Sequence, residues 1–175
     1  MAKKILIIVL ILLLLIIQTS FISGFWGVFN NFNLIFYILI FYSVIIGFEQ
    51  SLVLSFIFGI LLEPFTLLNF GVTTLCLLLS LFLVNLLFHA LFTNKSLYSL
   101  LVLLVIGICI NNLFVFIFNN FLFLIGLSGF KITLNVEYFS AIIWQSFLGM
   151  IFLSVAFTVF KAASRKLNSV FLITE

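Results

Sequence analysis

The sequence predicts an all-α integral membrane protein, a bundle of six transmembrane helices with both termini in the cytoplasm. Of its 175 residues, 66% are hydrophobic and only 6% are charged, and the mean hydropathy is +1.54. A soluble domain has roughly 45–50% apolar and about 25% charged residues, so this chain has too few polar side chains to cover a water-facing surface. With about 1.5 Å of rise per helical residue and a hydrocarbon core of ~30 Å, its length allows about six spanning helices and no separate soluble domain.

The first apolar stretch, residues 5–17, follows Lys3 and Lys4, a pattern shared by signal peptides and uncleaved signal anchors. No convincing Ala-x-Ala cleavage site follows it, so we expect it to be retained as the first helix. If it were cleaved, five spans would remain and the new N-terminus would face outward. Trp26 and the asparagines of residues 24–33 suit an interfacial loop before the second helix.

The third helix is short. Only twelve residues separate Gln50 from Glu63, and twelve helical residues rise about 18 Å, less than a full span. Either Glu49 and Glu63 both lie in the headgroup zones of a locally thinned bilayer, or the helix continues past Pro64. Proline lacks a backbone donor and disfavours helical geometry in the residue before it, so we expect a helix end or kink near Glu63.

The remaining boundaries follow from the polar turn at residues 93–96, the asparagines 119–120 and the glycine-containing loop after them. We therefore expect one domain, residues 1–175, without internal repeats. Its expected elements are helices at residues 5–23, 34–48, 51–63, 71–92, 97–118 and 138–160, and a cytoplasmic tail at 161–175.

The basic residues predict the orientation of the bundle. With six spans, one side of the membrane receives six basic side chains and the other receives only Lys131. Cytoplasmic loops carry the excess of Lys and Arg, so both termini are expected in the cytoplasm. The six are Lys3, Lys4, Lys95, Lys161, Arg165 and Lys166.

The composition also excludes several functions. The chain has no glycine-rich phosphate loop, no cysteine cluster and no basic nucleic-acid patch. Cys76 and Cys109 each lie in an apolar stretch and are expected to be small packing residues without a disulfide. No nucleophile, base and orienting acid can be assembled, and no metal-ligand set accompanies His89. We therefore predict a non-enzymatic protein with no cofactor, no metal and no nucleic-acid partner.

Glu63 is the most informative ionisable group, because a carboxylate in hydrocarbon costs ~2.5–3.5 kcal/mol on insertion scales. Three interpretations are open: a helix end that water reaches, a hydrogen-bond acceptor inside the bundle, or a proton or ion ligand. A proton relay would need a second ionisable group at the same depth. The only candidate is His89, which the predicted topology places at the opposite end of the bilayer, where it would be an interfacial or packing residue.

Small and polar residues are spaced along single faces of the last three helices. Such stripes let membrane helices approach closely and form hydrogen bonds with one another. Helix packing, a substrate cavity and a groove for a partner protein all remain open as explanations. The residues are Asn69, Thr73, Cys76 and Ser80 on the fourth helix, Gly107 and Asn111 on the fifth, and Gln145 and Gly149 on the sixth.

Residues 56–63, with the sequence FIFGILLE, are followed eight residues later by Gly71 and then by Thr74 and Leu75. This pattern resembles the middle of the rod shape-determining protein MreD family of bacteria. That family typically has a glycine, aliphatic residues and an acidic residue at the end of its third helix, and a glycine that opens the fourth. The similarity covers about residues 34–118, with Glu63 where aspartate is usual and without the proline often found before the second helix.

The resemblance implies a non-enzymatic inner-membrane subunit of the cell-elongation machinery, which assembles peptidoglycan. Such proteins associate with membrane lipids, with the bitopic protein MreC and, through it, with actin-like MreB and peptidoglycan synthases. The resemblance marks Gly59 and Gly71 as positions of close helix approach, and Glu63 as the residue that fixes the turn between the third and fourth helices. The main alternative is the substrate-binding subunit of an energy-coupling factor vitamin transporter. The bulky Leu and Ile residues of the first helix disfavour it, because such a subunit needs small residues there.

Overall fold

The computed structural model describes residues 11–22, 32–92 and 96–171, and these residues form helices joined by short turns and loops, without strands. A helical segment that begins at residue 11 ends as the π-helix η1 (Ile17–Ile22). It is followed by α2 (Leu34–Ile45), α3 (Phe48–Leu62), the 3₁₀-helix η3 (Glu63–Phe65), α4 (Val72–Leu91), α5 (Leu97–Leu124) and α6 (Val136–Phe171). The predicted all-α class is confirmed.

Four helical segments of the described chain are long and apolar enough to cross a membrane. They are Phe48–Phe65, Val72–Leu91, Leu97–Leu124 and Val136–Ala162. The segment Ile11–Ser20 and α2 are apolar but shorter. The predicted start of the first helix, at residue 5, and its end, at residue 23, lie outside the described residues.

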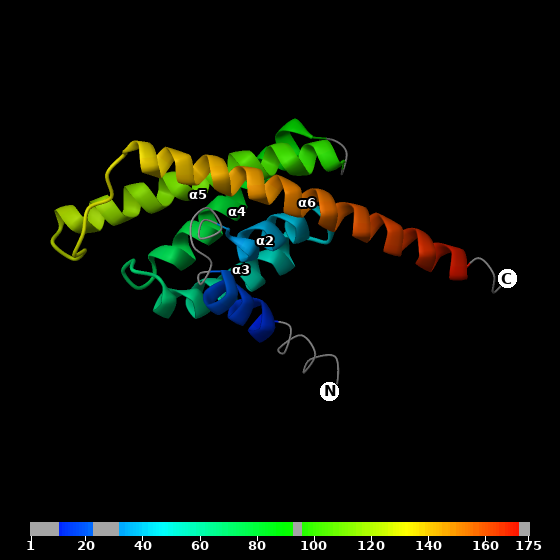
Figure 1. Cartoon of the computed structure of the whole chain (residues 1–175), viewed down its shortest axis with the longest axis horizontal. Coiled ribbons are helices and arrows are strands. Elements are labelled where there is room, and N and C mark those ends of the chain that lie inside the picture. Colours follow the sequence, from blue (N-terminus) through cyan, green and yellow to red (C-terminus); the bar gives the residue numbers. More distant parts are fainter. Residues whose placement is uncertain (1–10, 23–31, 93–95, 172–175) are drawn as a thin grey trace.

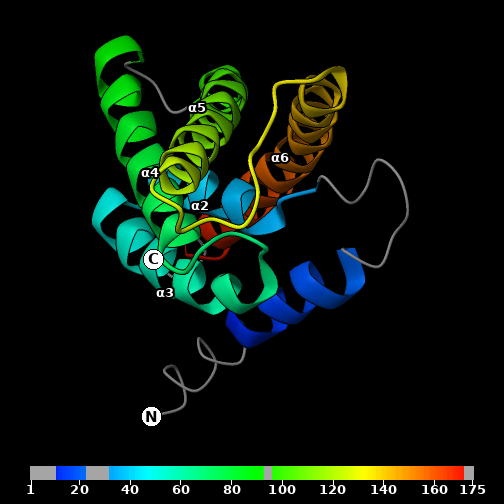
Figure 2. The same cartoon turned by 90° about the vertical axis from the view of Figure 1, so that its left-hand side faces the viewer.

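Helix α2 is the centre of the bundle. It contacts α3, α4, α5 and α6, and Figure 2, which looks at the bundle from one end, shows it inside the ring that these four helices form. Its side chains are buried on nearly all sides, including Phe36, Tyr37 and Ile40. A helix that is apolar all round and only 12 residues long is typical of a core helix. The expected span 34–48 is therefore three residues too long, and Phe48 already belongs to α3.

Helices α5 and α6 extend beyond their expected ends. We predicted that α5 would end near residue 118, but it continues to Leu124, where Gly126 adopts a left-handed φ of +80° and ends it. Asn119 and Asn120 do not break the helix because their amides bond to the backbone of Phe130 and Ile132 in the following loop.

We predicted a tail from residue 161, but α6 runs from Val136 to Phe171. The sequence between residues 160 and 171 contains no glycine or proline and is rich in Ala, Lys and Arg, which favour the helix. Figure 1 shows this long helix lying along α5 and then projecting past the rest of the bundle.

The connections alternate between the two ends of the bundle. In Figure 1 the turn between α3 and α4 and the loop between α5 and α6 lie at the left end, whereas α6 finishes at the right end. Lys131 belongs to the loop before α6 and Lys161 to the last third of α6, so most of the length of this helix separates them, as the predicted orientation requires. Which end faces the cytoplasm stays a prediction.

Candidate functional site

The strongest candidate site is the turn between α3 and α4, where Glu63 lies. Its side chain is only 4% exposed. Its Oε1 accepts hydrogen bonds from the Thr74 hydroxyl, at 2.6 Å, and from the Thr74 backbone N–H, at 3.3 Å. Glu63 thus joins the end of α3 to the first turn of α4, whose unpaired N–H groups and positive dipole end favour a carboxylate.

Gly59, one turn before Glu63, brings the two helices into contact. A Cβ at this position would lie 2.8 Å from the Cα of Thr74 and 2.9 Å from its Oγ1 and Cγ2. No side chain larger than hydrogen fits between the two backbones. The absence of a side chain at Gly59 therefore lets Thr74 come close enough to reach Glu63.

Gly71 allows the chain to enter α4. Its φ is +96°, a left-handed conformation that L-residues with a side chain rarely adopt, and nothing lies within 4 Å of the place a Cβ would occupy. The need for glycine here comes from the backbone and not from packing, so the close helix approach that the resemblance implied at Gly71 is wrong. Gly59, Glu63 and Gly71, the three residues marked by the resemblance, thus belong to one structural unit, the α3–α4 turn.

Thr73 was predicted to share a face with Asn69, and this prediction is wrong. The helix begins at Val72, so Asn69 lies before it in the turn. The Thr73 hydroxyl pairs instead with the Thr66 hydroxyl, at 3.2 Å, and Thr66 also donates to the carbonyl of Glu63. Thr73 supports the turn from outside, whereas its neighbour Thr74 holds the carboxylate.

These contacts distinguish between the interpretations of Glu63. The interpretation of Glu63 as a helix end that is accessible to water is wrong, because its carboxyl is buried in protein. The interpretation of Glu63 as a hydrogen-bond acceptor inside the bundle is confirmed. The other carboxyl oxygen, Oε2, is buried without a hydrogen-bond partner among the described residues. It can accept one further hydrogen bond.

His89 is exposed near the far end of α4, so the predicted separation from Glu63 is confirmed.

Asn111 lies where α4 and α5 meet, as its predicted helix face indicated. It is buried, and its Oδ1 lies 3.3 Å from the hydroxyl of Ser80, which donates to the carbonyl of Cys76. One turn away on α5, Gly107 leaves room for Val84 of α4 and Ile40 of α2, whose nearest atoms lie 2.9 and 3.0 Å from the place a Cβ would occupy. These residues pack the helices together.

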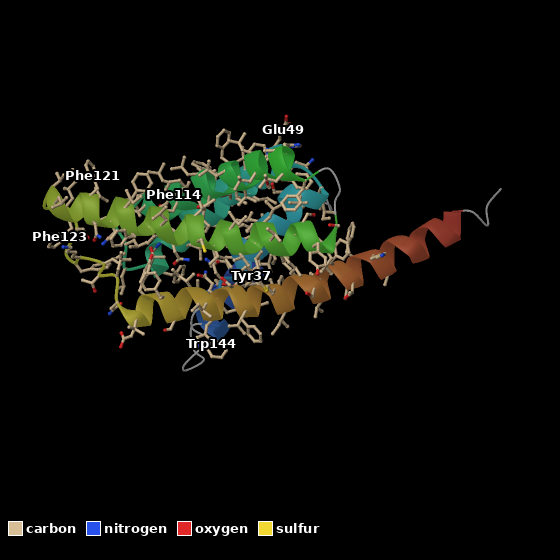
Figure 3. The ribbon with its side chains drawn as sticks, turned by 90° about the horizontal axis from the view of Figure 1, so that it is seen from above. Tyr37, Glu49, Phe114, Phe121, Phe123 and Trp144 are labelled. Atoms are coloured by element: carbon tan, nitrogen blue, oxygen red, sulfur yellow. The ribbon has the colours of Figure 1, made fainter. Side chains whose placement is uncertain are left out.

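Gln145 belongs to a second polar group, which joins α2, α5 and α6. Its Oε1 accepts a hydrogen bond from Asn112, at 3.0 Å, and its backbone carbonyl accepts one from the Tyr37 hydroxyl, at 2.7 Å. The carbonyl of Asn112 accepts a bond from the Tyr138 hydroxyl, at 2.8 Å. Figure 3 shows Tyr37 beneath the line where α5 and α6 meet. Gly149 of α6 makes room for the ring of Tyr37, whose nearest atom would lie 3.0 Å from a Cβ at position 149.

Thr74, Tyr37 and Asn112 were not predicted as bonding partners, although Thr74 stands in the pattern that carries the resemblance. Thr74 could have been found as a residue in the first turn of a helix that follows a buried acidic residue. This argument requires the first residue of α4 to be known. Tyr37 and Asn112 are polar residues in apolar stretches, and such residues usually find a partner within the protein. Ser51 and Ser55 were also missed, although with Gly59 they form a buried stripe of small residues at spacings of four.

Chemically, the described polar groups serve as hydrogen-bond donors and acceptors between helices. Within residues 11–22, 32–92 and 96–171, no group of three or more His, Cys, Asp or Glu side chains could hold a metal ion. Cys76 and Cys109 are both free, the first buried and the second exposed.

The fold and the α3–α4 turn define the class of this protein: an all-α chain whose four long apolar helices suggest a multi-pass membrane protein. Comparisons with protein-family models, with curated proteins and with solved structures found no match.

Proposed function

We propose that this protein is a non-enzymatic scaffold of the bacterial inner membrane that serves the peptidoglycan-synthesising machinery of cell elongation. In this role it resembles the MreD family and binds a bitopic, MreC-like protein. Through that protein it is linked to MreB and to the peptidoglycan synthases.

The observation that carries this proposal is the α3–α4 turn. The resemblance rests on Gly59, Glu63 and Gly71, and the described contacts give each of them a structural reason within one unit. A glycine that leaves no room for a Cβ, which would lie 2.8 Å from the Cα of Thr74, and a buried, bonded carboxylate fix the positions of two helices. A scaffold needs such rigidity, because a partner helix recognises a surface of fixed shape.

The outer surface supports the same role. Large apolar side chains project from α3, α5 and α6, for example Phe56, Ile117 and Ile143. The described polar side chains near the bundle centre are largely bonded within the protein, so contacts with other proteins in the membrane would be made by apolar helix faces. Helix association in membranes depends on such packing and on few hydrogen bonds.

The test is affinity purification of the tagged protein from native membranes in mild detergent, with mass spectrometry of co-purifying proteins and small molecules. The matched pair of variants is Glu63→Ala, which removes the buried carboxyl at the end of α3, and Glu49→Ala, which removes an exposed one from the first turn of α3. We expect an MreC-like protein with wild type and Glu49→Ala, and less of it with Glu63→Ala.

One result would refute the proposed function, and another would refute only the assigned site. Recovery of paired ATPases with a transmembrane coupling subunit, or of a stoichiometric vitamin, would identify a transporter subunit. Equal recovery of the MreC-like protein with both variants, together with unchanged melting in detergent, would remove Glu63 from the site.

A further inference from the structure

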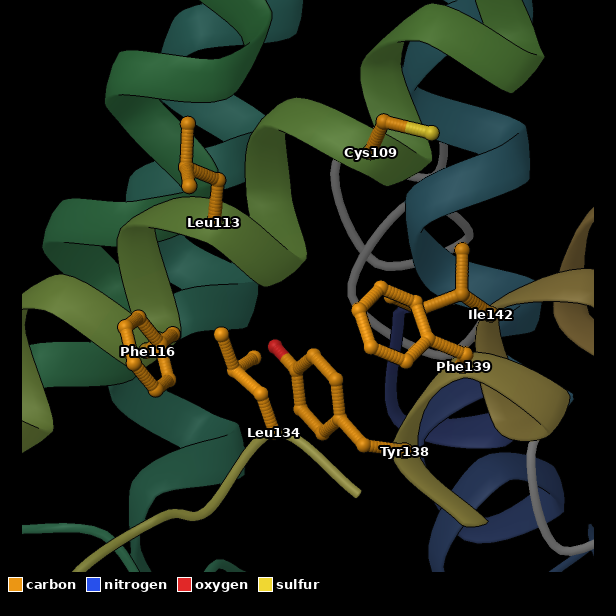
Figure 4. Close-up of a pocket in the computed structure, with 7 residues that line it drawn as sticks. All are labelled: Cys109, Leu113, Phe116, Leu134, Tyr138, Phe139 and Ile142. Atoms are coloured by element: carbon orange, nitrogen blue, oxygen red, sulfur yellow. The ribbon is translucent and has the colours of Figure 1, made fainter. Parts of the chain in front are cut away.

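An apolar groove of about 320 Å³ lies between α5 and α6 and opens to the outside of the bundle. Figure 4 shows its walls: residues from α5 on one side face residues from α6 and the preceding loop on the other. The only hydroxyl in its lining, that of Tyr138, is already bonded to the carbonyl of Asn112. The groove therefore offers an apolar surface. Its lining residues are Cys109, Leu113, Phe116, Leu134, Tyr138, Phe139 and Ile142.

The groove runs along the membrane-spanning parts of both helices, from one end toward the middle. Leu134 lies just before the first residue of α6, and Tyr138 lies in its first turn. Cys109 is near the midpoint of α5. The α5 wall from residue 109 to 116 is about 10 Å long, so the groove extends from the membrane interface toward the bilayer centre. The acyl chain of a lipid in one leaflet has the same direction and depth.

A cation lies at the interfacial end of this groove. Lys131 is exposed and only three residues before Leu134, which places it within about 10 Å of the groove wall along the chain. The backbone beside it is held in place, because Ile132 donates to and accepts from the side chain of Asn120, at 3.0 and 3.1 Å. Within the described part of the chain, no acidic side chain forms an ion pair with Lys131.

We infer that the groove binds one anionic phospholipid, with an acyl chain along α5 and α6 and its phosphate headgroup near Lys131. The size of the groove favours this ligand over a partner helix. A helix segment 10 Å long and about 10 Å in diameter occupies roughly 800 Å³, so it would lie mostly outside a groove of about 320 Å³, whereas a single extended acyl chain is narrow enough to lie within it. The inference does not depend on the proposed scaffold function.

Native mass spectrometry of the purified protein tests this site, with phosphatidylglycerol and phosphatidylcholine of identical chains as probes. Leu113→Trp fills the groove, and Ile117→Trp adds the same side chain to an exposed position on α5 outside it. We expect Leu113→Trp to lower phosphatidylglycerol binding about tenfold and Ile117→Trp to change it less than twofold. A second apolar groove of about 520 Å³, lined in part by Val102 and Met150, lies between the same helices. Leu113→Trp is therefore expected to remove one bound lipid and not every lipid.

Lys131→Ala tests the headgroup. It is expected to weaken phosphatidylglycerol binding about fivefold, the effect of one basic residue near anionic lipid, and to leave phosphatidylcholine binding unchanged. Melting in detergent must be the same for Leu113→Trp and Ile117→Trp. Equal lipid retention by these two variants, or equal loss of both lipids in Lys131→Ala, would overturn the inference. So would photo-crosslinking from a probe on Cys109 that captures a protein helix in native membranes and no lipid.

Discussion

Gly59→Ala tests the central packing contact of the α3–α4 turn. The added methyl group would lie 2.8 Å from the Cα of Thr74. Because that atom belongs to the backbone, no rotation of a side chain can relieve the contact, and α3 and α4 must move apart. The movement would also lengthen the hydrogen bonds between Thr74 and Glu63.

The magnitude follows from two opposing terms. Overpacking a well-packed core costs about 1–3 kcal/mol, and a contact with backbone belongs at the upper end of this range. Replacing a helical glycine by alanine recovers about 1 kcal/mol of helix propensity. We therefore expect the free energy of unfolding to fall by about 2 kcal/mol. For a chain of this size the fall corresponds to a melting temperature lower by roughly 4–8 °C.

The assay is thermal unfolding in detergent, followed by circular dichroism, with Gly47→Ala as the control. Gly47 precedes the same helix, has an extended φ of 172° and has nothing within 4 Å of its Cβ position, so its replacement should change stability by less than about 0.5 kcal/mol. Gly107→Ala should give an intermediate result, because its nearest atoms belong to side chains and not to backbone. Equal melting of the Gly59 and Gly47 variants would refute the reasoning about close helix approach.

Three further predictions concern hydrogen bonds and orientation. Thr74→Val should lower the free energy of unfolding in detergent by about 1 kcal/mol, because Glu63 loses the shorter of its two hydrogen bonds. Thr73→Val should lower it less, because Thr73 bonds to Thr66 and not to Glu63. A larger effect of Thr73→Val would contradict Thr74 as the partner of Glu63. A double-mutant cycle of Asn112→Leu and Gln145→Leu, measured by the same unfolding, should give a coupling energy of about 0.6 kcal/mol, and additive effects would count against the bond. A reporter enzyme fused to the C-terminus should be active in the cytoplasm, whereas external activity would reverse the predicted orientation.

The helical class could be predicted from composition, but the role of α2 could not. Its apolar residues predicted a membrane span equally well, because a core helix and a lipid-exposed helix both lack polar residues. Only its packing against four other helices distinguishes the two. The end of α5 was misjudged for a similar reason. Asparagine favours helix ends when its side chain competes for nearby backbone, but Asn119 and Asn120 bond to a loop that folds back on the helix.

In the candidate site, Glu63 was predictable as an acidic residue in an apolar stretch, whereas Gly59 and Gly71 were marked only by the resemblance. The partner of Glu63 was not, because adjacent residues of a helix point in directions about 100° apart. Asn111 and Gln145 were correctly placed on packing faces, yet the sequence does not reveal that Gln145 bonds to Asn112 on α5. Such pairs depend on how two helices are rotated about their own axes.

The small number of polar side chains bears on how this protein can function. Glu63 joins α3 to α4 at the turn between them. Nearer the bundle centre, Asn111 meets Ser80 between α4 and α5, and Gln145 with Asn112 joins α5 to α6. Successive helices from α3 to α6 are thus each connected by at least one polar contact. These contacts hold the helices in fixed positions, which suits the proposed scaffold function. Recognition of lipids and of partner helices needs only the apolar surface that such a fixed bundle presents.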